Sequence, residues 1–159
     1  MRHLAFVFAA LLTCAALSPA LAADSIETSS VVVPLADGWH EQAGSQPISA
    51  KGPGQELMEL TLVRAGSTKS LDAAEKAGIS AIMKAASGMK VVMPLKSFSM
   101  PNGTRVSEIV SQSQDGDRLL VGVSLRGPSA IVVATMEGPS ASGSVLAKAR
   151  GQLLSLRWK

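Results

Sequence analysis

Apolar positions along the chain switch from a two-residue repeat to a helical repeat near Ser70 and back after Gly88. Residues 57–64 alternate apolar and polar side chains, which predicts a half-buried strand. From Ser70, a good N-cap residue, the spacing becomes that of an amphipathic helix over 70–87, and Gly88 is placed to end it. Its predicted apolar stripe consists of Leu71, Ala74, Gly78, Ile79, Ile82, Met83 and Ala86.

The segments after this helix predict a run of antiparallel strands. Four strand-like stretches are separated by short turn sequences, and such short connections join antiparallel neighbours. They cover residues 90–100, 104–112, 118–126 and 130–137. A flexible loop at 138–143, a second helix beginning at Ser144 and a short strand at 155–158 complete the chain.

The region before residue 57 predicts fewer regular elements. Ala23 to Ser30 is polar and is interpreted as a loose leader, and Val31 to Pro34 predicts a short strand. Asp37-Gly38 predicts a turn, Trp39 beside it predicts a ring that plugs the end of a core, and residues 43–56 predict a surface loop with at most a short extended piece. The whole pattern is typical of one α+β domain over 31–159, with a single antiparallel β-sheet flanked by two helices.

The first 22 residues predict a cleaved export signal. Met1-Arg2-His3 is a basic start, residues 4–17 carry no charge, and Ala20-Leu21-Ala22 offers small residues at a cleavage site after Ala22. The apolar run is too short to cross a bilayer, so a transmembrane anchor is the less favoured interpretation. We therefore expect a periplasmic or secreted product of three parts: signal 1–22, leader 23–30 and domain 31–159.

Cys14 is the only cysteine, and it lies inside this signal. A lipoprotein interpretation is weak because Thr13 stands where Gly or Ala is usual and the preceding apolar stretch is short. The mature chain then has no cysteine, which excludes disulfides, thiolate metal sites and a thiol nucleophile.

Charge is distributed unevenly along the chain. Residues 24–59 hold six acids and only Lys51, net −5, whereas residues 60–159 hold 13 bases and six acids, net +7. A basic surface for an acidic partner or a membrane is one interpretation, and mutual neutralisation within the fold is the one favoured here. Nucleic-acid binding is excluded, since no dense basic run is present and only 3% of residues are aromatic.

His40 is a candidate for acid–base or metal chemistry, because it is the only histidine left after the signal. It stands next to Glu41 and near Asp37, but a metal site would need further ligands from elsewhere in the fold. A solvent-facing turn histidine is the favoured interpretation. No cofactor is expected, and no catalytic residue is assigned.

Several segments together resemble the PsbP and Ran-binding Mog superfamily, nearest to exported bacterial DcrB-like proteins. The resemblance rests on Val33-Pro34-Leu35-Ala36-Asp37-Gly38-Trp39, the helix 70–87, the run 104–137 and Leu153-Leu154-Ser155-Leu156-Arg157. It implies a PsbP/Mog-like sandwich, an antiparallel sheet flanked by helices, in proteins that act as binding or assembly factors without a shared catalytic residue. DcrB-like proteins are often lipoproteins, and the missing lipobox is a departure from them.

The expected function is therefore that of an exported, non-enzymatic binding or assembly factor whose partner is an envelope protein. The alternative is a small periplasmic enzyme or a ligand or metal carrier with a site near His40. Trp39, His40 and Trp158 are the predicted binding surface, with both rings at one end of the core and the loops 43–56 and 138–143 as rims. The competing interpretation is that both tryptophans are buried plugs. The oligomeric state is left open.

Overall fold

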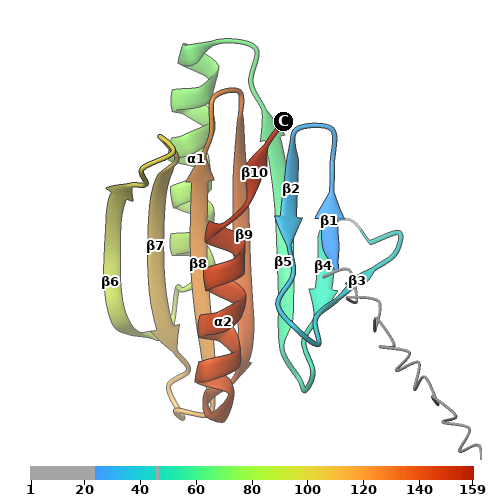
Figure 1. Cartoon of the computed structure of the whole chain (residues 1–159). Coiled ribbons are helices and arrows are strands. Elements are labelled where there is room, and N and C mark those ends of the chain that lie inside the picture. The colour runs from blue at the N-terminus through green and yellow to red at the C-terminus, as the bar shows by residue number, and fades with distance from the viewer. Residues whose placement is uncertain (1–23, 46) are drawn as a thin grey trace, which may run out of the picture.

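The computed structural model describes residues 24–45 and 47–159, and within them the chain forms two antiparallel sheets and two α-helices (Figure 1). The strands are β1 Ser25–Glu27, β2 Val31–Pro34, β3 His40–Gln42, β4 Ile48–Lys51, β5 Leu57–Arg64, β6 Lys90–Ser99, β7 Arg105–Gln112, β8 Arg118–Arg126, β9 Ala130–Pro139 and β10 Arg157–Trp158. The helices are α1 Thr68–Ala85 and α2 Gly143–Leu154, the latter preceded by a 3₁₀ turn, Ser140–Ser142.

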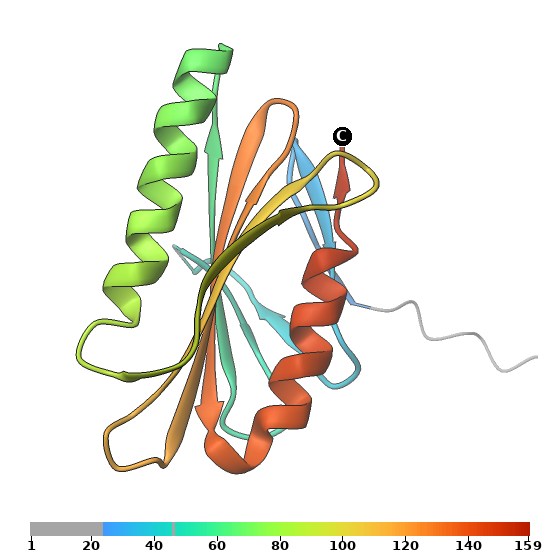
Figure 2. The same ribbon diagram turned by 90° about the vertical axis from the view of Figure 1, so that its left-hand side faces the viewer.

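The larger sheet has the strand order β3-β4-β5-β9-β8-β7-β6, and every neighbouring pair is antiparallel. The two helices lie on opposite faces of it (Figure 2). The α+β class with an antiparallel sheet and two flanking helices is thus confirmed. Helix α1 carries the chain from β5 to β6 at the far edge, so β6 pairs with β7 alone in the described part of the chain.

The second sheet corrects the expectation of a single sheet. It is three-stranded, with β2 between β1 and β10, and it joins the two ends of the domain. The leader interpretation is also wrong for residues 24–30, because Ile26 is 1% exposed and pairs with Val33. The hydroxyl of Thr28 accepts a hydrogen bond from the backbone N–H of Val31, and this bond closes the β1–β2 turn. One buried isoleucine among polar neighbours was too weak a pattern to predict this strand.

Two apolar clusters fill the two sides of the large sheet. The larger one lies under α2 and the small sheet and includes Trp39. The smaller one joins Ile82 of α1 and the C-cap residue Ala86 to Ile109 and Leu120 of the sheet. Gly122 allows α1 to approach closely, since a Cβ there would lie 2.8 Å from the Cβ of Ile82.

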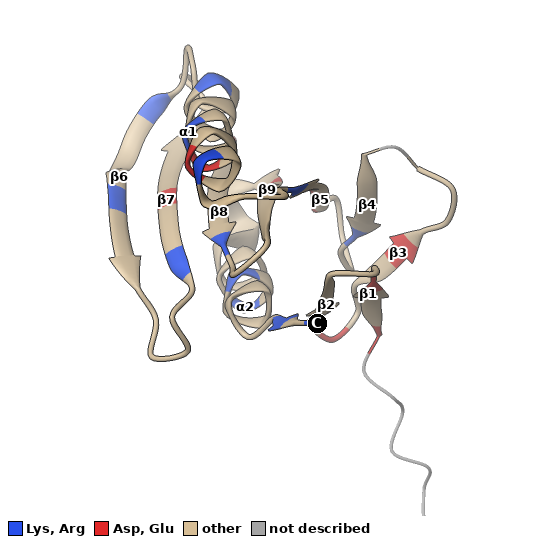
Figure 3. Ribbon diagram, turned by 90° about the horizontal axis from the view of Figure 1, so that it is seen from above, with Lys and Arg blue, Asp and Glu red and all other residues tan. Residues whose placement is uncertain are grey.

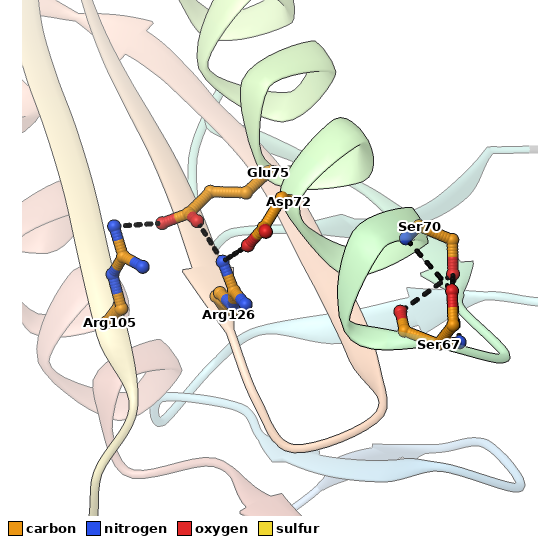
Figure 4. Close-up of polar contacts among 6 residues, drawn as sticks. All are labelled: Ser67, Ser70, Asp72, Glu75, Arg105 and Arg126. Atoms are coloured by element: carbon orange, nitrogen blue, oxygen red, sulfur yellow. Dashed lines mark hydrogen bonds and ion pairs between the residues drawn. The ribbon is translucent and has the colours of Figure 1, made fainter.

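The structure shifts several predicted boundaries. The N-cap of α1 is Ser67, and Ser70 is its reciprocal partner at the third helical position (Figure 4). Met83 of the predicted stripe is 44% exposed, while Glu75 is buried. The predicted 138–143 loop is instead the end of β9 followed by the 3₁₀ turn. None of the helices in the described residues is long and apolar enough to span a membrane.

Candidate functional site

The three residues predicted as a binding surface do not form one. Trp39 is 1% exposed and lies in the core, where a Cβ added to Gly52 would be 3.1 Å from its ring. Trp158 lies against Gly127, and its indole N–H donates to the hydroxyl of Thr104 at 2.9 Å. Gly52 and Gly127 flank opposite ends of the large sheet, so the expectation that both rings cap one end is wrong.

His40 is exposed and begins β3 rather than lying within the predicted turn. Its Nδ1 is 2.6 Å from Oδ2 of Asp24, and this one carboxylate is its side-chain partner among the described residues. No three His, Cys, Asp or Glu side chains in that part of the chain are grouped so as to hold a metal ion.

The favoured interpretation of the charge asymmetry is also corrected. Lys159 and Glu27, 3.2 Å apart, are the single ion pair that joins residues 24–59 to residues 60–159 in the described structure. The other lysines and arginines that form ion pairs do so with acids of their own region. The two regions therefore do not neutralise each other through direct contacts.

A groove on the α1 face of the large sheet is the strongest candidate site. Helix α1 packs over β8 and β9, which leaves the β7–β6 side of this face open (Figures 1 and 3). The groove has a volume of about 280 Å³. It is lined by Asp72, Glu75, Lys76 and Ile79 of α1, Ser97 of β6, and Arg105 and Ser107 of β7.

Two smaller hollows lie beside this groove, toward the tips of the strands. One lies over the end of β6 and includes Phe98 and Ser99, and the other lies between the β6–β7 and β8–β9 turns. Arg105 lines all three spaces. We name as the α1–β6 groove these three spaces together with the strip of surface between α1 and β6 that runs on from them to the exposed Met83 and Val91.

An ion-pair network forms one wall of the α1–β6 groove (Figure 4). Nη1 of Arg126 lies 2.5 Å from Oδ1 of Asp72 and 2.5 Å from Oε2 of Glu75. Nη2 of Arg105 lies 3.2 Å from the other oxygen, Oε1, of Glu75. Hydrogen bonds from Arg126 to Glu75 and then to Asp72 raise the pKa of Arg126 above its ordinary value, against the opposing effect of burial. The buried Glu75 is thus compensated by two arginines.

The two arginines face each other across neighbouring strands, since Arg105 of β7 pairs directly with Arg126 of β8. Like charges directly opposite one another destabilise a sheet. Asp72 and Glu75, three residues apart on one side of α1, supply the compensating charge. The strand segments predicted at 104–112 and 118–126, paired end to end, place Thr104 opposite Arg126, one residue away from the observed register, so the predicted bounds did not bring the two arginines together.

The opposite end of the α1–β6 groove is apolar. Val91 of β6 pairs with Ser111 of β7 in the same ladder as Ser97 with Ser107, which places Val91 on the α1 face of the sheet. Met83 follows the groove residue Ile79 by one helical turn. Val91 is 50% and Met83 44% exposed, so apolar surface is available to a partner here.

The comparisons with known proteins support the fold and name no family. No family model matches the chain, and no curated protein matches it. Among solved structures the chain is similar to LpqN of Mycobacterium tuberculosis, described as involved in cell envelope biogenesis, with a TM-score of 0.63 and 10% sequence identity. The similarity covers 81% of this chain and 83% of LpqN. The protein therefore has the α+β fold seen in LpqN.

Proposed function

We propose that this protein is an exported, non-enzymatic binding or assembly factor of the PsbP/DcrB-like type, acting on an envelope protein. The export pattern of residues 1–22 supports the location. The fold similarity to LpqN, a protein of cell envelope biogenesis, supports an envelope context. Binding rather than catalysis is favoured because the polar groups of the α1–β6 groove are engaged in ion pairs that hold α1 to the sheet.

The observation that carries the proposal is the uncovered β7–β6 side of the sheet beside α1. A groove open along a strand suits an extended segment of a partner better than a compact small molecule. From Ser99, opposite Arg105, to Val91, opposite Ser111, the strand is long enough for about eight extended residues of a partner, or about 25 Å.

Site-specific photocrosslinking in the native envelope tests this proposal. A photoreactive amino acid at Ser97 lies in the groove, whereas one at Lys148 lies on the exposed side of α2, on the other face of the sheet. We expect discrete protein adducts from position 97, weakened when Met83→Trp narrows the groove, and none of the same adducts from position 148. The same adducts from both positions, or none from position 97, would contradict the proposal.

A further inference from the structure

Arg105 occupies the point at which the three spaces of the α1–β6 groove meet, since it lines each of them. Its side chain is 58% exposed although its guanidinium is held in place by Glu75. Arg126, by contrast, is 14% exposed, and its Nη1 is already shared between two carboxylates. Of the two arginines, Arg105 is the one able to contact a partner.

The guanidinium of Arg105 has N–H donors that Glu75 does not engage. Arginine carries five N–H donors, and the contact with Glu75 engages one nitrogen, Nη2. The fork geometry of the remaining donors matches a carboxylate. Glu75 fixes the direction of Arg105, while Arg105 and Arg126 together balance the charges of Asp72 and Glu75.

Other groups near Arg105 favour an anionic ligand as well. Lys76 is exposed on the groove wall and forms no ion pair with another described residue. Across the groove the hydroxyls of Ser97 and Ser107 lie 2.7 Å apart, and one of the two can donate outward. Counting Arg126, three basic and two acidic side chains surround this end of the groove.

We infer that Arg105 binds a carboxylate side chain of the extended partner segment. This inference rests on the proposed function, because it names the chemistry recognised in the same groove. The segment carries aspartate or glutamate where it passes Arg105 and apolar side chains about six to eight residues away, where it passes Met83 and Val91. The partner is thus recognised by a charge at one end and by apolar contact at the other.

Peptides of about eight residues, selected from a random library for binding to the intact mature protein, serve as probes of the groove. We expect the selected peptides to share an acidic residue near one end and apolar residues near the other. Amide chemical shifts of the isotope-labelled protein should change at β6, β7 and the facing side of α1 on addition of such a peptide.

A double-mutant cycle then assigns the acidic residue to Arg105. One selected peptide and its Glu→Gln or Asp→Asn form are titrated against the wild type and Arg105→Gln. The wild type should bind the acidic peptide at least about tenfold more tightly than the amide peptide, and Arg105→Gln should lose this preference. Arg118→Gln is the matched control, because Arg118 is 45% exposed and also lies 3.2 Å from a glutamate, Glu137, away from the groove.

Arg105→Lys keeps the positive charge, and the lysine can still reach Glu75. It therefore tests the role of position 105 if Arg105→Gln does not fold. We expect it to retain part of the preference, since an ammonium lacks the planar fork. Peptides that bind the groove with no acidic preference would overturn this inference and leave the proposed function standing. Peptides that bind elsewhere, or a library that yields no binder, would overturn both.

Discussion

The indole of Trp158 lies directly against the backbone of Gly127, leaving no room there for a Cβ. Trp158 belongs to β10, and Gly127 belongs to the turn between β8 and β9. This contact therefore packs β10 against the large sheet. The hydrogen bond from Trp158 to Thr104 extends the attachment to the residue before β7. The side chain of Trp158, on β10 of the small sheet, thus connects the small sheet to the large one.

Replacing Gly127 by alanine is therefore expected to destabilise the protein by about 1–3 kcal/mol, because the new methyl group displaces the ring. Gly127 has no left-handed φ, so backbone strain contributes nothing to the effect. Gly151→Ala is the control: Gly151 lies in α2 with open space around it, and alanine should stabilise the helix by up to about 1 kcal/mol. Urea unfolding followed by tryptophan fluorescence measures both, and equal effects would show that Trp158 does not rest on Gly127.

The apolar face of α1 provides a second test. Ile82 is fully buried against Gly122 and Ile109, whereas Lys84 is exposed. Ile82→Asp should cost several kcal/mol because it buries a charge without a partner, and Lys84→Ala should change the free energy of unfolding by less than about 0.5 kcal/mol. Denaturant titration of both variants decides the matter, and similar losses would mean that α1 faces another way.

The strands of the two sheets show what the periodicity of apolar positions can and cannot predict. Residues 57–64 and 118–126 were predicted with the bounds observed for β5 and β8, because alternation and turn residues define both strands locally. Strand β1 has three residues, too few for any repeat to be visible, and the short strand predicted at 155–158 is observed as β10, two residues long. Their pairing with β2 depends on chain ends meeting in space, which no local pattern encodes.

The α1–β6 groove escaped prediction for a related reason. Its residues come from one helix and two strands, and the groove exists because α1 packs over β8 and β9 and leaves β6 bare. The predicted strand bounds miss the register of Arg105 opposite Arg126 by one residue, and no local pattern gives the distance from α1 to β6. Trp39 follows a turn, where a ring can serve either as a binding surface or as a buried plug, and in the structure it is a buried plug.

The buried charge of Glu108, on the other face of the sheet, provides a further test, because its ion pairs should contribute more to stability than an exposed pair. Glu108 is fully buried, with Lys96 of β6 3.0 Å from one oxygen and Arg150 of α2 2.6 Å from the other. Glu108→Gln leaves both bases without their counter-ion, and a loss of about 1–3 kcal/mol is expected, below the full value for a buried pair because Lys96 and Arg150 can reach solvent.

Glu137→Gln is the comparison for Glu108→Gln. Glu137 and Arg118 are each nearly half exposed, so their pair should contribute less than about 1 kcal/mol. Thermal unfolding of the two variants in low and moderate salt measures the contrast. If Glu108→Gln were as mild as Glu137→Gln, the Lys96–Glu108–Arg150 contacts would not hold α2 to the sheet.

The export signal is tested by the chemistry of the mature N-terminus. The pattern of residues 1–22 predicts that exported protein begins at Ala23 or within a residue or two of it. N-terminal sequencing and intact mass of material from the native envelope measure this directly. A product that retains Met1, or one that carries lipid on Cys14, would contradict the predicted location.

Acid pH should weaken the protein partly through Glu56, which is buried beside the end of β9. A hydrogen bond from the Ser142 hydroxyl is the largest cause that lowers the pKa of Glu56, the backbone N–H of Gly54 adds to it, and burial opposes both. Because the pKa of Glu56 is lower in the folded state than in the unfolded chain, the ionised carboxylate stabilises the fold. This stabilisation is fully present when the pH lies above the pKa of an unfolded-state glutamate, about 4.3. That contribution is lost as the pH falls through the folded-state pKa.

Glu56→Gln should therefore lower the free energy of unfolding at pH 7 and lose less stability than the wild type on acidification. The difference between the two proteins should shrink as the pH falls from about 5 to below the folded-state pKa. Urea unfolding across this range measures it, with the exposed Glu59→Gln as the control for a carboxylate on the neighbouring strand β5. A Glu56→Gln curve that runs parallel to that of the wild type would show that the carboxylate does not link the 52–56 segment to Ser142 in its ionised form.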